Sequence, residues 1–452
     1  MTQSDGTRPD VVLIHCHDLG RWLSCYGMPS VPSPNLERFA RDATVFDNAH
    51  AAAPLCSPAR GALFTGLSPH QNGIQGLAHD AWRYRENVLT APEHLRALGY
   101  RSTLIGLQHE HVDPDVLGYD EVAGAGFLPR AHQVVDAARG WLAGQAPRDT
   151  RAPLFAAIGV WEVHRPWPES DYTPADPAEV EVPDFLPDTP ATRRDIAAFH
   201  GSIRQLDEAM GRLFEALDSH LDPANTLIIF TTDHGPAFPR AKSTLYDAGT
   251  GVSLLVRPPT AWGEAPARVD SIASHVDILP TLLEVAGGPA DPSLEGRSLA
   301  PLFTAAKSKA ADDRMIFTEK TYHDNYDPKR AVRTRDFALI RNFTPGPKLA
   351  LSLDLEHSPT RQGMGDAHLE ARDMTELYDR RVDPHELNNV FDQPEYQNIR
   401  TRLLKALDEW MLTTRDPLLE GPIHPPKHRT RAMDALPPLP ANTDTSMSGV
   451  SS

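Results

Sequence analysis

The chain has 452 residues, of which 40% are hydrophobic and 23% charged, and its formal net charge at pH 7 is −17. This composition is ordinary for a globular protein, and the length suits one large α/β domain followed by a smaller one. The negative charge argues against nucleic acid, anionic membranes and long polyanionic substrates as partners, and no stretch is long and apolar enough to span a membrane.

The first ten residues are polar and lack the apolar core of a signal peptide. Three cysteines, an odd and small number, argue against a disulfide framework. We therefore expect a flexible N-terminus over residues 1–10, a cytoplasmic location, and core thiols at Cys16 and Cys25.

Val11 to His15 is a short apolar run typical of a buried strand, and Cys16-His17-Asp18 follows it. Ligands of open α/β sheets bind at the carboxyl ends of the strands. His17 and Asp18 are therefore candidate site residues, although polar residues at a strand end can also simply face solvent.

A helix is expected from Pro34, and the segment Cys56-Ser57-Pro58-Ala59-Arg60 begins the next one. Pro58 suits the first turn of a helix, which puts Cys56 at the helix N-terminus, where backbone N–H groups favour anions. Arg60 lies one turn further on and can return to the same pocket. The segment suits sulfate or phosphate, but a free cysteine at a helix start is also often a small buried hydrophobe.

Further along the chain, three more strands end in polar residues, and helices separate them. The strand Tyr100–Gly106 precedes Leu107 to His111, Pro153–Val160 precedes Trp161 to Trp167, and Thr226–Thr232 precedes Asp233-His234. Amphipathic helices are expected over Thr90–Leu98 and from Ile196 to Leu217, after a long surface loop over residues 168–192. This alternation predicts an α/β fold with a mainly parallel sheet.

The Cys56 segment, with Thr65-Gly66 after it, resembles the Cys-x-Pro-x-Arg…Thr-Gly signature of the type I sulfatases, which belong to the alkaline-phosphatase-like superfamily. The resemblance implies that a formylglycine-generating enzyme oxidises Cys56 to formylglycine, whose hydrate attacks sulfur. One hydroxyl displaces the leaving group, and the other lets the aldehyde reform with expulsion of sulfate. Ala59 departs from the usual Ser of the signature.

The same resemblance implies a divalent metal held by His17, Asp18, Cys56, Asp233 and His234. The family has an Asp pair where His17-Asp18 stands, and it ends the later strand with Asp-Asn or Asp-His. The family ion is Ca²⁺, but the two imidazoles also suit Mn²⁺ or Zn²⁺.

The remaining catalytic candidates follow from the family motifs. His109 matches the His of Gly-Lys-x-His, while Leu107 replaces its Lys; His164 matches the second His of His-x-Pro-His, while Trp161 replaces the first. The resemblance implies that His109 holds the hydrate, and we interpret His164 as the proton donor to the leaving group. Lys242 matches the cationic residue that binds a sulfate oxygen.

The resemblance extends from Val11 to about Pro417 and includes a C-terminal signature, Glu376 to Asp379 and Asp383 to Glu386. Within the family, the sulfamidases, or N-sulfoglucosamine sulfohydrolases, are the most similar branch. The implied architecture is a catalytic domain over residues 11–314 with a large mixed, mainly parallel sheet flanked by helices. A smaller α+β subdomain with a short antiparallel sheet follows over 315–421, and then a Pro/Ser-rich tail over 422–452.

Three functions stay open on this evidence. The first is a sulfatase or sulfamidase acting on a small sulfated substrate, with a homo-oligomer left open. The second is a phosphonate or phosphate ester hydrolase on the same scaffold, which a site rich in His would suit. The third is a catalytically degenerate, anion-binding family member, motivated by the substitutions at His17, Leu107 and Trp161.

Overall fold

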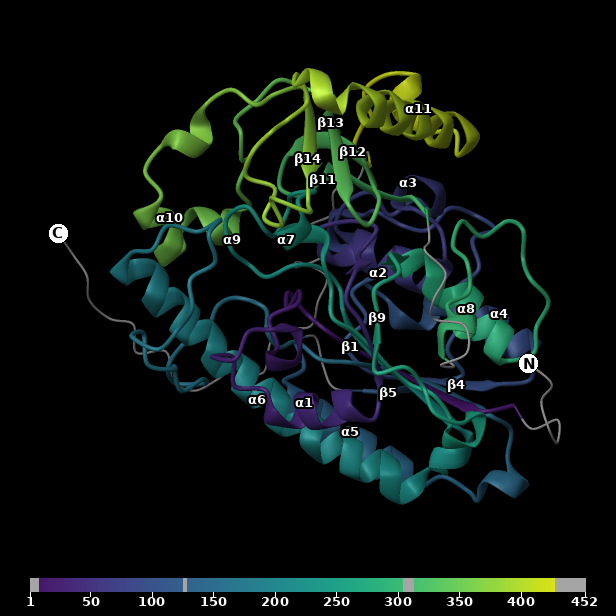
Figure 1. Cartoon of the computed structure of the whole chain (residues 1–452). Helices are drawn as coiled ribbons and strands as arrows, with labels where there is room; N and C mark the ends of the chain where they lie inside the picture. The colour runs from purple at the N-terminus through teal and green to yellow at the C-terminus, as the bar shows by residue number, and fades with distance from the viewer. Residues whose placement is uncertain (1–7, 125–127, 304–312, 427–452) are drawn as a thin grey trace.

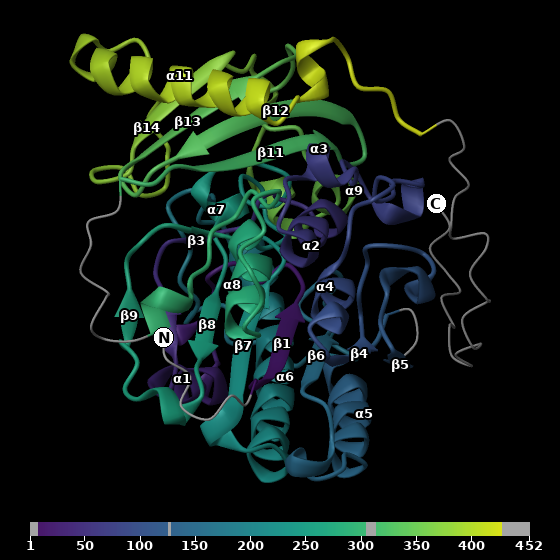
Figure 2. The ribbon, with the colours of Figure 1, turned by 90° about the vertical axis from the view of Figure 1, so that its right-hand side faces the viewer.

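The computed structural model describes residues 8–124, 128–303 and 313–426. Most of the expected flexible N-terminus and tail therefore lies outside the described residues. Two sheets dominate the molecule: a large one in the body, and a smaller one that lies above it with helix α11 along its outer side (Figures 1 and 2).

The large sheet has eight strands in the order β5-β4-β6-β1-β7-β8-β2-β9. The five strands from β5 to β7 run parallel, whereas β8 is antiparallel to both of its neighbours. This mixed, mainly parallel sheet confirms the predicted fold class. Its strands are β1 (Asp10–Cys16), β2 (Thr44–Phe46), β4 (Arg101–Gly106), β5 (Glu121–Ala123), β6 (Leu154–Gly159), β7 (Thr226–Thr232), β8 (Leu254–Arg257) and β9 (Arg268–Val269).

Helices cover both faces of this sheet because its central strands are apolar on both sides. Along β1, Val12 and Ile14 face one core and Val11 and Leu13 the other. The first core includes α1 (Pro34–Arg41), α5 (Ala131–Ala143) and the long α6 (Pro190–His220). The second includes α2 (Cys56–Thr65), α4 (Ala91–Ala97) and α8 (Ile278–Val285), and Figure 1 shows the two groups on opposite sides of the sheet.

The C-terminal sheet is antiparallel, with the order β11-β12-β13-β14. Helix α11 (Gln397–Thr413) packs its apolar side, which includes Leu403 and Leu407, against Val332 and Leu339 of the sheet. The strands are β11 (Ile316–Tyr322), β12 (Tyr326–Arg333), β13 (Phe337–Asn342) and β14 (Thr375–Asp379). Short elements complete the described fold: β3 (Ala49–His50), β10 (Ala273–Ser274), α3 (Pro69–Asn72), α7 (Asp247–Thr250), α9 (Leu353–Glu356) and α10 (Pro359–Gly363).

Buried polar contacts around Glu386 hold the C-terminal sheet against the rest of the molecule. Glu386, in the C-terminal signature, accepts hydrogen bonds from Arg333 of β12, with Nη1–Oε1 at 2.6 Å, and from the backbone N–H of Asp247 at 2.8 Å. Both charged side chains of the Arg333–Glu386 pair are 0% exposed. The division at residue 315 stays a prediction.

Two local expectations are corrected. Residues 168–192 do not form a surface loop throughout, because Tyr172 and Leu186 insert into the core and α6 already begins at Pro190. Cys16 is a fully buried thiol as expected, but Cys25 is only partly buried. Among the described helices, none combines the length and the apolarity needed to cross a bilayer.

The Glu386 pair gives a stability prediction. Glu386→Ala leaves the guanidinium of Arg333 buried without its partner, so the free energy of unfolding should fall by about 3–5 kcal/mol. The matched control is Asp408→Ala, because the pair of Asp408 with Arg341 is surface-exposed, with Asp408 55% exposed. Its loss should cost no more than about 1 kcal/mol in urea unfolding. Equal effects of the two substitutions would contradict this assignment.

Candidate active site

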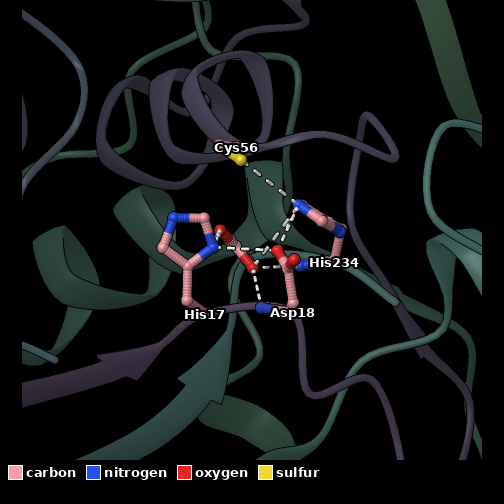
Figure 3. A group of neighbouring side chains, drawn as sticks. His17, Asp18, Cys56 and His234 are labelled. Atoms are coloured by element: carbon pink, nitrogen blue, oxygen red, sulfur yellow. Dashed lines mark hydrogen bonds and ion pairs between the residues drawn. The ribbon is translucent and has the colours of Figure 1, made fainter. Parts of the chain in front are cut away.

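Five predicted site residues meet at the carboxyl ends of β1 and β7. His17 and Asp18 follow β1, Asp233 and His234 follow β7, and Cys56 is the first residue of α2. One potential ligand atom from each lies within 4.8 Å of all the others, and all five residues are buried. Figure 3 shows the Cys56 sulfur at the helix start, pointing toward His234.

Short contacts bind this cluster together. Nδ1 of His17 donates to Asp18 Oδ1 at 2.9 Å and lies 3.0 Å from Asp233 Oδ2. Nε2 of His234 lies 3.1 Å from Asp18 Oδ1 and 3.6 Å from Cys56 Sγ. The two imidazoles therefore lie against the two carboxylates, and the sulfur adjoins the same cluster.

Hydrogen bonds from backbone N–H groups to the Asp233 carboxylate join the loop after β1 to the loop after β7. The N–H groups of Asp18 and His234 donate to Asp233 Oδ1 at 2.9 and 2.8 Å. Asp18 adopts a left-handed conformation, with φ of 51°. Gly20, with φ of +59°, lies so close to Pro236 that a Cβ there would be 2.8 Å from the proline ring. The loop after β1 thus depends on backbone geometry that few residues adopt.

Arg60 contacts the cluster through the carboxylate of Asp233. It is fully buried, and its Nη2 donates to Asp233 Oδ2 at 3.0 Å and to the Cys16 carbonyl at 3.2 Å. Its Nη1 contacts Nδ1 of His15. The guanidinium therefore supports Asp233 rather than contacting the sulfur directly.

Lys242 stands beside the cluster and has three acceptors around its ammonium group. Nζ lies 2.8 Å from Asp18 Oδ2, 2.8 Å from Asp354 Oδ2 and 3.2 Å from His164 Nε2. Nδ1 of His164 donates to the Arg165 carbonyl, which leaves Nε2 as the acceptor facing Lys242. The ring of His164 also packs against those of His17 and Trp161, with centroids at 4.6 and 4.3 Å.

His109 also adjoins His17, with ring centroids 5.8 Å apart, and its Nε2 lies 3.4 Å from Nδ1 of His79. Leu107, where the family has Lys, is buried, and its backbone N–H donates to Gly159 O. The structure thus brings both His109 and His164 next to His17 and supplies no cation at position 107.

The charges in the cluster strongly shift its pKa values. Burial raises the pKa of the Cys56 thiol, but the positive charges of His17 and Lys242 outweigh this and hold it well below its usual range. Burial lowers the pKa of His234, but Asp233 and Asp18 raise it to about 10. Burial lowers the pKa of His109 to about 4. The charges of His17 and Lys242 thus favour the thiolate form of Cys56, whereas burial favours the neutral form of His109.

The donor set fits a divalent cation. Two carboxylates and two imidazoles converge with the Cys56 side chain, and Nε2 of His17 is a buried nitrogen for which the described residues provide no hydrogen-bond partner. Mixed nitrogen and oxygen donors of this kind are typical metal ligands. Binding would require the His ligands to give up their protons, so metal affinity should rise with pH.

Two residues near the site were missed by sequence reasoning. Asp354, on α9, contacts Lys242 across 112 residues of sequence, and no local pattern announces it. His79 stacks on His109, with ring centroids 5.7 Å apart. The only sequence feature that could have indicated His79 as a site residue is its position shortly after the helix that begins at Cys56.

Comparison with known proteins agrees with this geometry. A family model described as Sulfatase matches residues 9–288, and one described as N-sulphoglucosamine sulphohydrolase, C-terminal, matches residues 239–363. Human N-sulphoglucosamine sulphohydrolase is 29% identical over 91% of this chain and 92% of its own length. An ulvan-active sulfatase of Formosa agariphila is 26% identical over 90% of this chain and 76% of its own length.

Solved structures share the fold at about 20% identity. A putative sulfatase from Bacteroides fragilis superposes with a TM-score of 0.74 over 94% of this chain and 100% of its own. A protein solved in complex with its substrate D-glucosamine-2-N,6-O-disulfate gives a TM-score of 0.70, covering 91% and 99%. The phosphonate monoester hydrolase of Agrobacterium radiobacter gives 0.68, covering 90% and 95%. Because the Sulfatase model spans more than half of the 452 residues, the chain belongs to the sulfatase family of hydrolases.

Proposed function

We propose that this protein hydrolyses sulfate esters or N-sulfates through a formylglycine formed from Cys56, with the help of a divalent metal. One observation carries the proposal: the Cys56 sulfur lies at the start of α2, 3.6 Å from His234 Nε2, in a cluster with Asp18 and Asp233 that Lys242 adjoins. The nucleophile, the metal ligands and the cation for sulfate are thus within reach of one small anion.

The proposed reaction has two steps, and both take place at the hydrated aldehyde of position 56. One hydroxyl of the aldehyde hydrate at position 56 attacks sulfur, the bond from sulfur to the leaving oxygen or nitrogen breaks, and the leaving group takes a proton. The second hydroxyl then loses its proton, the bond between carbon and the sulfated oxygen breaks, and the aldehyde reforms as sulfate departs. Water adds to the aldehyde to restore the hydrate.

His164 is the group proposed to protonate the leaving group, and for this its Nε2, which accepts from Lys242 in this structure, must first take up a proton. Lys242 would bind a sulfate oxygen, His109 would hold the hydrate, and Arg60 would fix the carboxylate of Asp233.

His17, Asp18, Asp233 and His234, with the modified Cys56, would hold the metal. A divalent ion there supplies a Lewis acid that polarises a sulfate oxygen and lowers the pKa of the hydrate. Two imidazoles among four protein ligands favour Mn²⁺ or Zn²⁺ over the family's Ca²⁺.

The substrate class we favour is a small sulfated molecule, first an N-sulfated amino sugar. The human relative is an N-sulphoglucosamine sulphohydrolase, and the C-terminal family model bears the same name. We keep the formylglycine-generating enzyme as the partner in maturation and the cytoplasm as the expected location, with a homo-oligomer left open.

A phosphonate or phosphate ester hydrolase is the second candidate. The fold of the Agrobacterium radiobacter phosphonate monoester hydrolase and the His-rich ligand set favour it. The degenerate, anion-binding alternative has less support, since Cys56, Asp18, Asp233 and Lys242 converge with the contacts that catalysis needs.

The first prediction concerns maturation. In a host with the converting enzyme, the tryptic peptide 42–60 should lose one sulfur and two hydrogens and gain one oxygen at Cys56, as read by mass spectrometry. Cys56→Ala should abolish turnover, while Cys25→Ala, which changes a thiol outside the site, should retain it. An unmodified thiol, or an active Cys56→Ala protein, would contradict the mechanism.

The second prediction concerns His164. His164→Asn should lower kcat by about 10²–10⁴-fold for N-sulfated glucosamine, whose leaving amine must be protonated. The loss should be much smaller for 4-nitrophenyl sulfate, which leaves as a stable anion. His111→Asn serves as the control, because His111 is partly exposed and bonds only to its own loop. The same loss of kcat on both substrates would argue against general-acid catalysis by His164.

The third prediction concerns the metal. Dialysis against a chelator should abolish activity, and Mn²⁺ or Zn²⁺ should restore it better than Ca²⁺. Elemental analysis should find bound metal in the wild type and little in Asp233→Ala. Full activity in metal-free protein would exclude this role.

A further inference from the structure

The ammonium of Lys242 has no donor to spare in this structure. It carries three protons. Its three neighbours, Asp18 Oδ2 at 2.8 Å, Asp354 Oδ2 at 2.8 Å and His164 Nε2 at 3.2 Å, account for all of them. An oxyanion can therefore bind Lys242 only if one of the three acceptors moves away.

Asp354 is the acceptor that can move. Asp18 is fully buried and held by His17 and His234, and His164 packs against the rings of His17 and Trp161, while its Nδ1 contacts the Arg165 carbonyl. Asp354, in contrast, is 25% exposed and comes from the four-residue helix α9. The other contact of its carboxylate is with Ser352 of the same segment.

The displaced carboxylate would stay close to the bound anion. The backbone N–H of Leu353 is tied to Asp324 Oδ2 at 2.9 Å, which holds the start of α9 in place. On its outer side, Asp354 borders a cavity of about 470 Å³, lined also by Arg165, Trp167 and His357. Arg165 in this wall is already paired with Asp195 at 2.8 Å, so it does not cancel the charge of Asp354.

A fixed negative charge beside the anion site distinguishes anions by their charge. A sulfate ester, an N-sulfate and a phosphonate monoester each carry one negative charge. A phosphate monoester carries about 1.5 to 2 at pH 7. Inorganic sulfate, the product of the proposed reaction, carries two, so repulsion by Asp354 would be stronger for the product than for the substrate.

We propose that Asp354 is a specificity-determining residue that competes with the anion for Lys242, disfavours doubly charged phosphate monoesters and promotes release of inorganic sulfate. This inference rests on the proposed function, because it takes Lys242 as the residue that binds sulfate. Leu107 and Trp161 provide no further cation at their positions, so the anion site depends strongly on Lys242.

The test compares two anions of similar shape and different charge, inorganic sulfate and methanesulfonate, by titration calorimetry. Asp354→Asn should bind sulfate about tenfold tighter or more than the wild type, and the gain for methanesulfonate should be distinctly smaller. Glu356→Gln is the matched control: it removes one charge from the same helix, at a side chain that is 41% exposed and faces Arg361. Its affinities should stay within about twofold of the wild type.

Lys242→Ala should lose sulfate binding, which verifies the anion site itself. If Asp354→Asn fails to fold, as judged by its melting curve, Asp354→Ala replaces it. The inference is overturned if the ratio of the two affinities is the same in the Asp354 variant and in Glu356→Gln, or if no variant binds sulfate. These titrations need no turnover, so an inactive wild type with an unmodified Cys56 would refute the proposed function separately.

In kinetics, the same substitution should raise kcat/KM for 4-nitrophenyl phosphate about tenfold more than for 4-nitrophenyl sulfate. Product inhibition by sulfate should strengthen in parallel. A structural role of Asp354 would lower both kcat/KM values together and leave their ratio unchanged.

Discussion

The site depends on the hydrogen bonds and ion pairs of one buried carboxylate, that of Asp233. It accepts hydrogen bonds from the backbone N–H groups of Asp18 and His234, from Arg60 at 3.0 Å, and lies 3.0 Å from His17. A buried carboxylate is tolerated only when its partners are this complete. One charge therefore fixes the loop after β1, the loop after β7 and helix α2 relative to each other.

The parallel sheet explains why these segments meet at all. β1 and β7 are adjacent and in register from Asp10 beside Thr226 to Cys16 beside Thr232, so their loops begin side by side. Helix α2 packs through Ala59 and Leu63 on the face of the sheet that carries Val11 and Leu13 of β1. Strand register and helix packing therefore place the polar residues of the site close together, and their charges then act on one another.

Much of this arrangement could be predicted from the sequence. The strand Thr226–Thr232 agrees with β7 residue for residue, because an unbroken run of β-branched and apolar residues ends at Asp233. Four of the five cluster residues could be predicted from motifs at strand ends, and Cys56 from the signature at a helix start. Helix α5 was missed, although Val134, Val135, Ala138 and Trp141 repeat at helical spacing. β12 was missed because buried, paired charges such as Arg330 and Arg333 interrupt its apolar pattern. Asp354 could not be found, since tertiary folding alone brings it to Lys242.

The burial of helix α2 also has a consequence for the maturation of the protein. All ten of its residues are buried, and Cys56 is only 3% exposed. In the closed fold, a second protein can reach this thiol only over that small exposed fraction. On the proposed chemistry, the modification would therefore come before the sheet and helices close around Cys56. Oxidation of the nascent polypeptide would then compete with its folding, and a molecule that folds first would keep an unmodified thiol.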